Sequence, residues 1–449
     1  MEYFSMPAWT MIPFVIMLLA IAIGPIIAEK FWERNTNKLI VSAILGIPVA
    51  IFMLIKGNEI VDPDGMNMAT SLVDTVFFDY LPFIILLLSL YVVTGGIHLG
   101  GDIKAKPIIN TMFLAIGFVL ASLMGTTGAA MLLIRPVLTT NQQRKYKMHT
   151  VLFFIALVAN CGGLLTPLGD PPLFMLFLRG ASFTWFASMW APWLFTGAIL
   201  LLLYFLADTY YYRKEDWVNL SADSREREPL SLSGKLNFLW LVGIIASVAF
   251  INKGFIPAMG EENAPIYIKY LREIALVVLT VLSLVTTSKK VRYDENKYSW
   301  DSILEVAALF IGIFVTMAPA LIFLKQHAAD LGLTHIWQYY YSTGALSAFL
   351  DNTPTAVAFH SMATGLSPEV MASMDTTLVA GIPQILLKAI CIGAVFFGSM
   401  TYIGNGPNFM VKSIAEANDV KMPSFFGYMI KFSLIVLLPV YILVQIIFL

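Results

Sequence analysis

Residues 162–177 read GGLLTPLGDPPLFMLF, and this stretch sets prolines, glycines and one aspartate into an apolar segment. Pro167, Gly169, Asp170, Pro171 and Pro172 all fall within six consecutive positions. A proline inside a helix removes a backbone hydrogen bond and clashes with the preceding turn. The stretch therefore predicts a helix that is broken near its middle.

The rest of the chain places this break in a membrane. Of the 449 residues, 58% are hydrophobic and 13% are charged, and the mean hydropathy is +0.77. A soluble domain carries roughly 25% charged residues. Apolar runs of about 17 to 25 residues, enough to cross a bilayer as a helix, recur from end to end. The composition predicts an all-α polytopic membrane protein.

Several classes of protein are excluded by composition. The two cysteines, Cys161 and Cys391, both lie in apolar segments, so no disulfide framework or metal-ligand spacing is present. A net charge of −1 without a basic face excludes nucleic acid as a partner. The N-terminus MEYFSMPAWT lacks the basic region of a cleaved signal peptide, so the first apolar run is expected to be a retained span. We expect no cofactor.

The apolar runs divide into full spans and two hairpins. Residues 107–139 and 341–366 each hold two apolar arms that bend at 125–128 and 351–354, and we expect both to be re-entrant hairpins. The full spans are expected at about 10–28, 39–55, 80–98, 149–178, 183–207, 237–252, 273–287, 302–323, 379–411 and 424–447.

Basic residues predict the orientation of these spans. With the N-terminus outside, the inner segments hold 19 Lys and Arg and the outer segments hold 6. Because basic residues favour cytoplasmic loops, both termini are expected to be extracytoplasmic and the linker 208–236 cytoplasmic. We expect the protein in the inner membrane.

The first break has a partner in the second half of the chain. GLLTPLGDPPLFMLF (163–177) aligns with GSMTYIGNGPNFMVK (398–412), which places Asp170 on Asn405. The bends at 125–128 and 351–354 also correspond. Each half then reads as three spans, a hairpin, a broken span and a final span.

Each half crosses the membrane five times. Because five is an odd number, the second half begins on the opposite side from the first and has the inverted topology. We expect one inverted repeat of about 5+5 helices, as in secondary transporters. The first repeat is 1–207, with its hairpin at 107–139 and its broken helix at 149–178. The second repeat is 237–449, with its hairpin at 341–366 and its broken helix at 379–411.

Two acidic residues are expected near the middle of the membrane, where charge is costly and usually functional. Asp170 precedes two prolines and could cap a helix, bind an ion or do both. Asp351 lies at the second hairpin tip, and the same alternatives hold there. With Asn352 they are the candidate sodium ligands. The other candidates in the predicted polar centre are Thr126, Thr127, Asn160, Thr166, Thr353, Thr401, Asn405 and Asn408.

These motifs resemble the ion transporter superfamily, which holds NhaD-type sodium/proton antiporters, arsenite-type efflux carriers and citrate-type sodium symporters. The resemblance rests on NCGGLLTPLGDPP (160–172), LDNTPT (350–355) and TYIGN (401–405). It implies paired hairpins, broken helices, a homodimer and elevator-type movement. Dicarboxylate symporters carry Ser-Asn-Thr at both tips, whereas here only Asn352 and Thr353 fit. The second tip is most similar to NhaD-type antiporters.

Two functions follow as alternatives. The first is a cation/proton antiporter, with sodium as the expected cation, in which a buried carboxylate holds a proton or a cation in turn. The second is a sodium-coupled symporter of a carboxylate such as citrate, or of an inorganic anion, since helix N-termini at the breaks attract anions. An intramembrane aspartyl protease also uses two embedded aspartates, but it leaves the repeat unexplained. We expect no enzyme.

The orientation is testable with cysteines introduced into 208–236. We expect an impermeant thiol reagent to leave them unlabelled in intact cells and to label them after permeabilisation. Labelling from outside in intact cells would contradict the predicted orientation.

Overall fold

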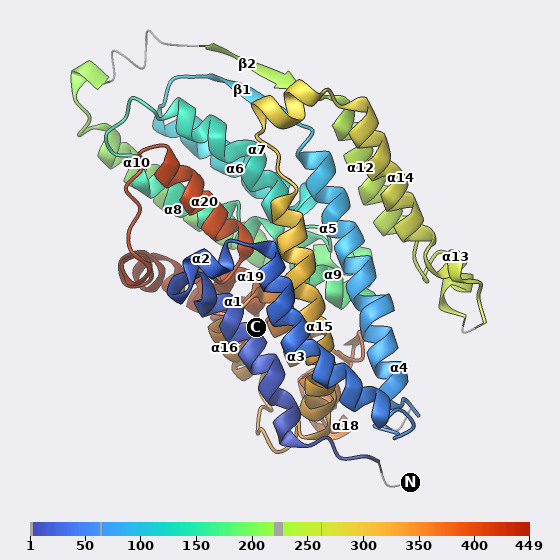
Figure 1. Ribbon diagram of the computed structural model, residues 1–449. Coiled ribbons are helices and arrows are strands. Elements are labelled where there is room, and N and C mark those ends of the chain that lie inside the picture. Colours follow the sequence, from blue (N-terminus) through green and yellow to red (C-terminus); the bar gives the residue numbers. More distant parts are fainter. Residues whose placement is uncertain (1–2, 63–64, 220–227, 262) are drawn as a thin grey trace.

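The computed structural model describes residues 3–62, 65–219, 228–261 and 263–449, and its chain is mainly helical (Figure 1). Among these residues, eight helical segments are long and apolar enough to cross a membrane. The prediction of an α-helical polytopic membrane protein is therefore confirmed.

The helices of the first half follow the order of the apolar runs, with 3-10 and π segments marked η. They are η1 Ala8–Thr10, α1 Met11–Ile27, α2 Glu29–Trp32, α3 Asn35–Ile55, α4 Met68–Val73, η2 Asp74–Tyr80, α5 Leu81–Thr94, α6 Pro107–Met124, α7 Thr126–Thr140, α8 Met148–Leu157, η3 Cys161–Leu165, α9 Pro171–Leu178, η4 Phe183–Met189 and α10 Trp190–Tyr212.

The second half continues with a comparable series. It comprises α12 Leu236–Phe250, η5 Pro257–Gly260, α13 Ile266–Lys269, α14 Leu271–Thr286, η6 Lys290–Glu295, α15 Asp301–Gln326, α16 Ile336–Ser347, α17 Asn352–Thr364, α18 Pro368–Met374, α19 Gln384–Phe397, η7 Gly398–Met400, α20 Gly406–Ala417, α21 Phe425–Tyr428, η8 Met429–Leu437 and α22 Leu438–Phe448.

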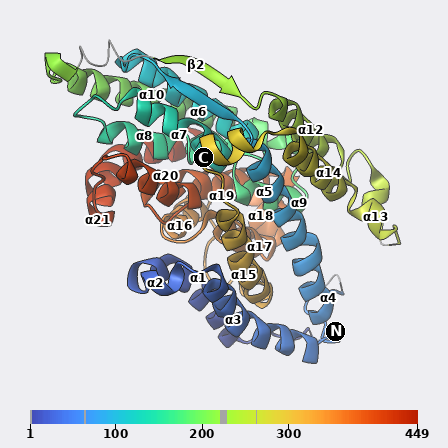
Figure 2. The same cartoon turned by 45° about the horizontal axis from the view of Figure 1, so that its top comes forward.

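Helices from both halves pack against one another. Helix α15 packs along α3 with α1 against both, and α5 packs against α12 and α14. In Figure 2 α1 and α3 lie at one side of the molecule and α12 and α14 at another. The short and broken helices pack with one another: α6 with α7 and η3, α16 with α19, and α17 with α19 and α9. The breaks are therefore enclosed by protein.

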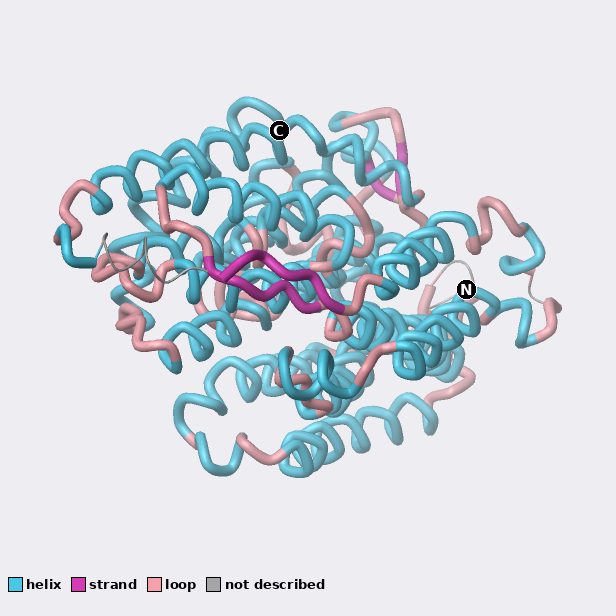
Figure 3. The backbone as a smooth tube through the Cα atoms, turned by 90° about the horizontal axis from the view of Figure 1, so that it is seen from above, coloured by secondary structure: helices cyan, strands magenta, loops and turns pink. Residues whose placement is uncertain are grey.

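Short strands are the feature that the all-α prediction missed. Strand β1 (His98–Asp102) pairs antiparallel with β2 (Glu228–Ser233), with His98 opposite Ser233. Figure 3 shows the two strands side by side across one face. A second pair, β3 (Leu378–Val379) and β4 (Ile382–Pro383), is shorter still. The predicted linker 208–236 thus contains β2, whose alternating EPLSLS sequence is typical of a strand.

Two segments differ from the predictions. The helix predicted at 80–98 covers Met68–Thr94, because Asn67 and Thr70 form a capping box that starts it earlier. Helices α12 and α14, in contrast, lie within two residues of the ranges predicted at 237–252 and 273–287. The first arm of the predicted hairpin 107–139 has 18 residues and is itself a candidate span.

The contact between α3 and α15 provides a test of packing. A Cβ added to Gly312 on α15 would lie 2.6 Å from Ser42 Cβ and 2.8 Å from Met17 Cε. We expect Gly312→Ala to lower stability by about 1–3 kcal/mol because the helices must separate, seen as a lower midpoint of thermal unfolding in detergent.

Gly46 on α3 is the matched control. Its added Cβ would meet Val315 Cγ1 at 3.5 Å, an ordinary contact. We expect Gly46→Ala to be neutral or to stabilise by up to about 1 kcal/mol through helix propensity. Equal midpoints for the two variants would contradict this account of the interface.

Candidate functional site

The two helix breaks share one backbone geometry. After η3, Thr166 is extended (φ −142°, ψ 158°), and Asp170 is extended directly before α9 (φ −143°, ψ 140°). After η7, Thr401 (φ −139°, ψ 168°) and Asn405 (φ −147°, ψ 140°) have nearly the same angles before α20. The sequence match between the two stretches is therefore also a match in local structure.

Each break is fastened to a neighbouring hairpin tip by a threonine. Thr166 donates its hydroxyl hydrogen bond to the carbonyl of Ser122, just before the turn at Gly125. Thr401 donates in the same way to the carbonyl of Ala348, just before the second tip. Gly125 joins α6 to α7 with φ 81° and ψ 150°, a conformation that favours glycine. Thr166 and Thr401 therefore hold the tips in place.

The carboxyl group of Asp170 lies where the breaks and tips meet. The residue is 1% exposed. Its Oδ1 accepts hydrogen bonds from Thr126 Oγ1 (3.0 Å) and Asn405 Nδ2 (3.2 Å), and its Oδ2 accepts one from Asn352 Nδ2 (2.9 Å). Thr126 and Asn352 occupy corresponding positions in the two tips. One side chain thus joins both tips to the second break.

Asp170 occupies the N-cap position of α9 without capping it. Its side chain makes no capping hydrogen bond and faces the three donors instead. Thr126 and Asn352 are the first residues of α7 and α17, and Asn405 is the N-cap of α20. The N-termini of four helices therefore meet at this carboxyl group. Each carries a partial positive charge that favours an anion.

Asparagines extend the network from one break to the other. Asn405 Nδ2 also donates to Asn160 Oδ1 (3.1 Å), and Asn160 Nδ2 donates to Asn408 Oδ1 (2.7 Å). Asn408 Nδ2 in turn donates to the carbonyls of Gly398 (2.7 Å) and Thr401 (2.9 Å). Buried amides that satisfy one another in this way fix a single arrangement of the two breaks.

Asp351 has a different place from Asp170. It is half-buried, and its Oδ1 accepts the backbone N–H of Thr353 at 2.9 Å, so it caps α17. The Thr353 hydroxyl is buried and has no hydrogen-bond partner among the described residues. A buried hydroxyl without a partner costs about 1–3 kcal/mol, so this oxygen is open to a ligand.

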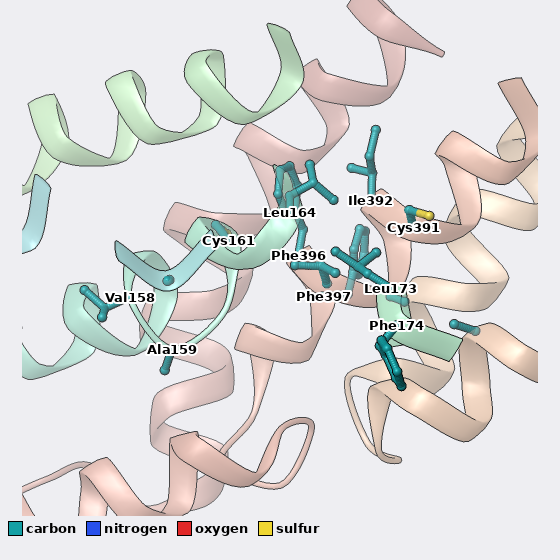
Figure 4. Close-up of a cluster of buried hydrophobic side chains, with 14 of the residues drawn as sticks. Val158, Ala159, Cys161, Leu164, Leu173, Phe174, Cys391, Ile392, Phe396 and Phe397 are labelled. Atoms are coloured by element: carbon teal, nitrogen blue, oxygen red, sulfur yellow. The ribbon is translucent and has the colours of Figure 1, made fainter. Parts of the chain in front are cut away.

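Apolar side chains surround the network. Figure 4 shows Leu164, Leu173, Phe396 and Phe397 gathered with Cys161 between η3, α9 and α19. All five are at most 4% exposed. The polar groups therefore face one another in a dry setting, where each hydrogen bond is strengthened and each missing one is costly.

A cavity of about 100 Å³ adjoins the first hairpin tip. Thr126, Thr127, Gly169, Tyr91 and Ser302 are among the residues that line it. Thr127 makes no side-chain hydrogen bond within the described part of the chain. Most of the other lining residues are apolar, and Asp170 itself does not line the cavity.

The oxygen atoms of this network are suitable ligands for a small hard cation. Among the described residues, no group of three or more His, Cys, Asp and Glu could hold a metal ion. Carboxylate, hydroxyl and amide oxygens are instead hard ligands. A carboxylate has about four acceptor positions, and the three hydrogen bonds of Asp170 leave one of them open on Oδ2.

Sequence reasoning overlooked two serines of the network. Ser347 Oγ donates to Asn352 Oδ1 (2.6 Å), which orients the amide nitrogen toward Asp170. Ser122 Oγ donates to the carbonyl of Gly162 in the first break. Both serines lie shortly before a hairpin tip, and this small polar residue next to each bend was the available signal.

Helices long and apolar enough to cross a membrane, set around a polar centre at paired helix breaks, are typical of a membrane transporter. Residues 3–449 match the family described as "Putative citrate transport", and the chain belongs to this family. The Inner membrane protein YbiR of Escherichia coli (strain K12) is 23% identical over 287 residues, which cover 61% of this chain and 69% of YbiR. The family supports the citrate-transporter-like superfamily, and the nearer likeness to NhaD-type antiporters stays a prediction.

Gly398 tests whether the network matters for transport. A Cβ there would lie 2.4 Å from Asn352 Oδ1 and 3.0 Å from Asn160 Oδ1. We expect Gly398→Ala to displace the Asn352 amide from Asp170 and to lower the transport rate on the order of tenfold or more. The rate is measured in proteoliposomes at matched amounts of monodisperse protein.

Gly406→Ala is the control for this substitution. Gly406 begins α20, and an added Cβ would meet nothing within 4 Å. We expect this variant to transport at the wild-type rate. A wild-type rate for Gly398→Ala would show that the Asn352 contact is dispensable.

Proposed function

We propose that the protein is a secondary transporter of the inner membrane that exchanges a monovalent cation, sodium first, for protons at Asp170. The observation that carries this proposal is a carboxyl group buried among three neutral donors, with no Lys or Arg of the described chain bonded to it. A buried carboxylate without a cationic partner is costly. It therefore has to hold a proton or a small cation.

The neighbouring oxygens support cation binding. The open position on Asp170 Oδ2, the Thr126 hydroxyl and the amide oxygen of Asn352 lie in one network, and the unpartnered Thr353 hydroxyl follows Asn352 in the chain. Asp351 belongs to the helix cap beside this site. A proton and a cation compete for the same carboxylate oxygen, and this competition couples the two fluxes.

The matched breaks support the wider architecture. The backbone angles of Thr166 and Thr401, and of Asp170 and Asn405, agree to within 10°, which fits two repeats of one fold. We propose that the repeats are inverted, with re-entrant hairpins ending at Thr126 and Asn352. The protein would act as a homodimer whose hairpin-bearing part moves. The similarity to YbiR, which is named an inner membrane protein, supports the inner membrane as the location of this protein.

Sodium-coupled carboxylate symport is the second candidate. The family description favours it, and four helix N-termini would attract an anion. Against it, the Asp170 carboxylate already occupies the point where these N-termini meet. A citrate anion placed there would face a like charge.

Proteoliposomes containing a pH dye separate the two candidates. We expect external sodium to drive proton efflux and citrate to have no effect on it. The apparent sodium affinity should fall as the pH drops, because protons occupy Asp170. Sodium-dependent uptake of labelled citrate would contradict cation/proton exchange and would identify the protein as a symporter.

Variants of the carboxylate identify the exchange site. We expect Asp170→Asn to abolish exchange in a folded protein, since an amide cannot release a proton or neutralise a cation. The exposed Glu416→Gln should behave as wild type. Because Asn405 occupies the corresponding position and donates to Asp170, adding Asn405→Asp to Asp170→Asn should restore part of the activity. Normal exchange by Asp170→Asn alone would refute the proposal.

A further inference from the structure

We infer that the exchange is electroneutral, with one monovalent cation moved for one proton, because the network holds a single exchangeable carboxyl group. This inference rests on the proposed exchange and adds its stoichiometry and the charge of its substrate. It depends on the difference in position between Asp170 and Asp351, the two aspartates of the site region.

Asp351 caps α17 and makes no hydrogen bond to Asp170. Its Oδ1 accepts the Thr353 N–H, and its carbonyl accepts the Thr355 hydroxyl (2.9 Å). The second tip reaches Asp170 through the Asn352 amide instead. Asp351 is also half-buried, whereas Asp170 is 1% exposed. Its carboxylate caps α17, whereas that of Asp170 caps no helix and faces the donors of the network.

The other charged groups near Asp170 have partners elsewhere. Helix α9 packs against α5, α17 and α19, and α5 carries no charged side chain. His360 on α17 contacts the carbonyl of Ala380 at 2.8 Å, and Arg179 at the end of α9 pairs with Asp79 at 3.1 Å. Neither group joins the Asp170 network.

Two further helices contact the network region. Arg135 on α7 donates to the carbonyl of Asn296 at 2.7 Å, and Lys412 on α20 pairs with Glu416 at 3.0 Å. Lys388 on α19 precedes the break at Gly398 by ten residues, which is roughly 15 Å of helix. Asp170 is therefore the one carboxyl group of the described residues that these helices enclose at the breaks.

Charge balance then sets the stoichiometry. With a proton, Asp170 is neutral, and with one monovalent cation, the ion pair is neutral as well. A second cation or a divalent cation would leave a net positive charge among groups that are otherwise neutral and buried. Burying such an uncompensated charge is strongly unfavourable. The site thus has the same net charge whether Asp170 carries a proton or a monovalent cation.

The stoichiometry is measured by finding the sodium gradient that stops proton flux. With about a tenfold proton gradient across proteoliposomes, one-for-one exchange stops at about a tenfold sodium gradient of the same direction, since a tenfold concentration ratio is worth about 1.4 kcal/mol for either ion. We expect this result. A balance point near a hundredfold sodium gradient would mean two protons per sodium and would overturn the inference.

A potassium diffusion potential set with valinomycin gives an independent readout. We expect exchange rates to be the same at inside-positive and inside-negative potentials, and calcium and magnesium to drive no exchange. Exchange that follows the potential would overturn electroneutrality while leaving the exchange itself intact. Absence of sodium-driven proton flux at any gradient would instead refute the proposed function.

Asp351→Asn separates the two aspartates. Asparagine keeps the helix cap, so we expect a folded protein whose balance point stays at one proton per sodium. A balance point that shifts in this variant would show that Asp351 carries a proton in the wild type. That result would overturn the inference even if the rate were unchanged.

Discussion

One buried carboxyl group constrains the centre of this protein. Asp170 is buried, so its oxygens need donors from the protein, and three distant segments supply them. Two helix breaks and two turns bring four helix N-termini to this point, and backbone freed from a helix in this way is tolerated where protein encloses it. The breaks, the tips and the threonines that tie them together all serve this arrangement.

Glycines make the close approach possible. A Cβ on Gly163 would lie 2.8 Å from Thr126 Cγ2, and a Cβ on Gly398 would lie 2.4 Å from Asn352 Oδ1. The two glycines correspond in the aligned stretches, and so do the two side chains that they admit. A glycine therefore allows the close approach in both halves. The polar side chains at the two breaks differ, because Asp170 is a carboxylic acid and its counterpart Asn405, which donates to it, is an amide. A nearly symmetric frame thus holds one charged group.

A second buried cluster positions the first hairpin from its other end. Asp208 near the end of α10 accepts from Arg144 (2.7 Å) and contacts His149 (2.7 Å), and Asn110 on α6 donates to it at 3.1 Å. Asp208 and Arg144 are almost fully buried. Breaking one partner of such a group leaves a buried charge unpaired, so the cluster ties α6 to α8 and α10. The pair of helices α6 and α7 is consequently held both at its turn and at the start of α6.

Local sequence determined much of this protein. Hydrophobic runs fixed the helical membrane class, and Pro and Gly placed the breaks and tips within a few residues, because both effects act over one or two turns of chain. The roles of Asp170 and Asp351 were decided only by tertiary structure. Both carry the local signature of an N-cap, yet Asp351 caps and Asp170 does not, since Thr126, Asn352 and Asn405 reach Asp170 from segments that are remote in sequence. The strand pairing of 98–102 with 228–233 was likewise set by long-range contact.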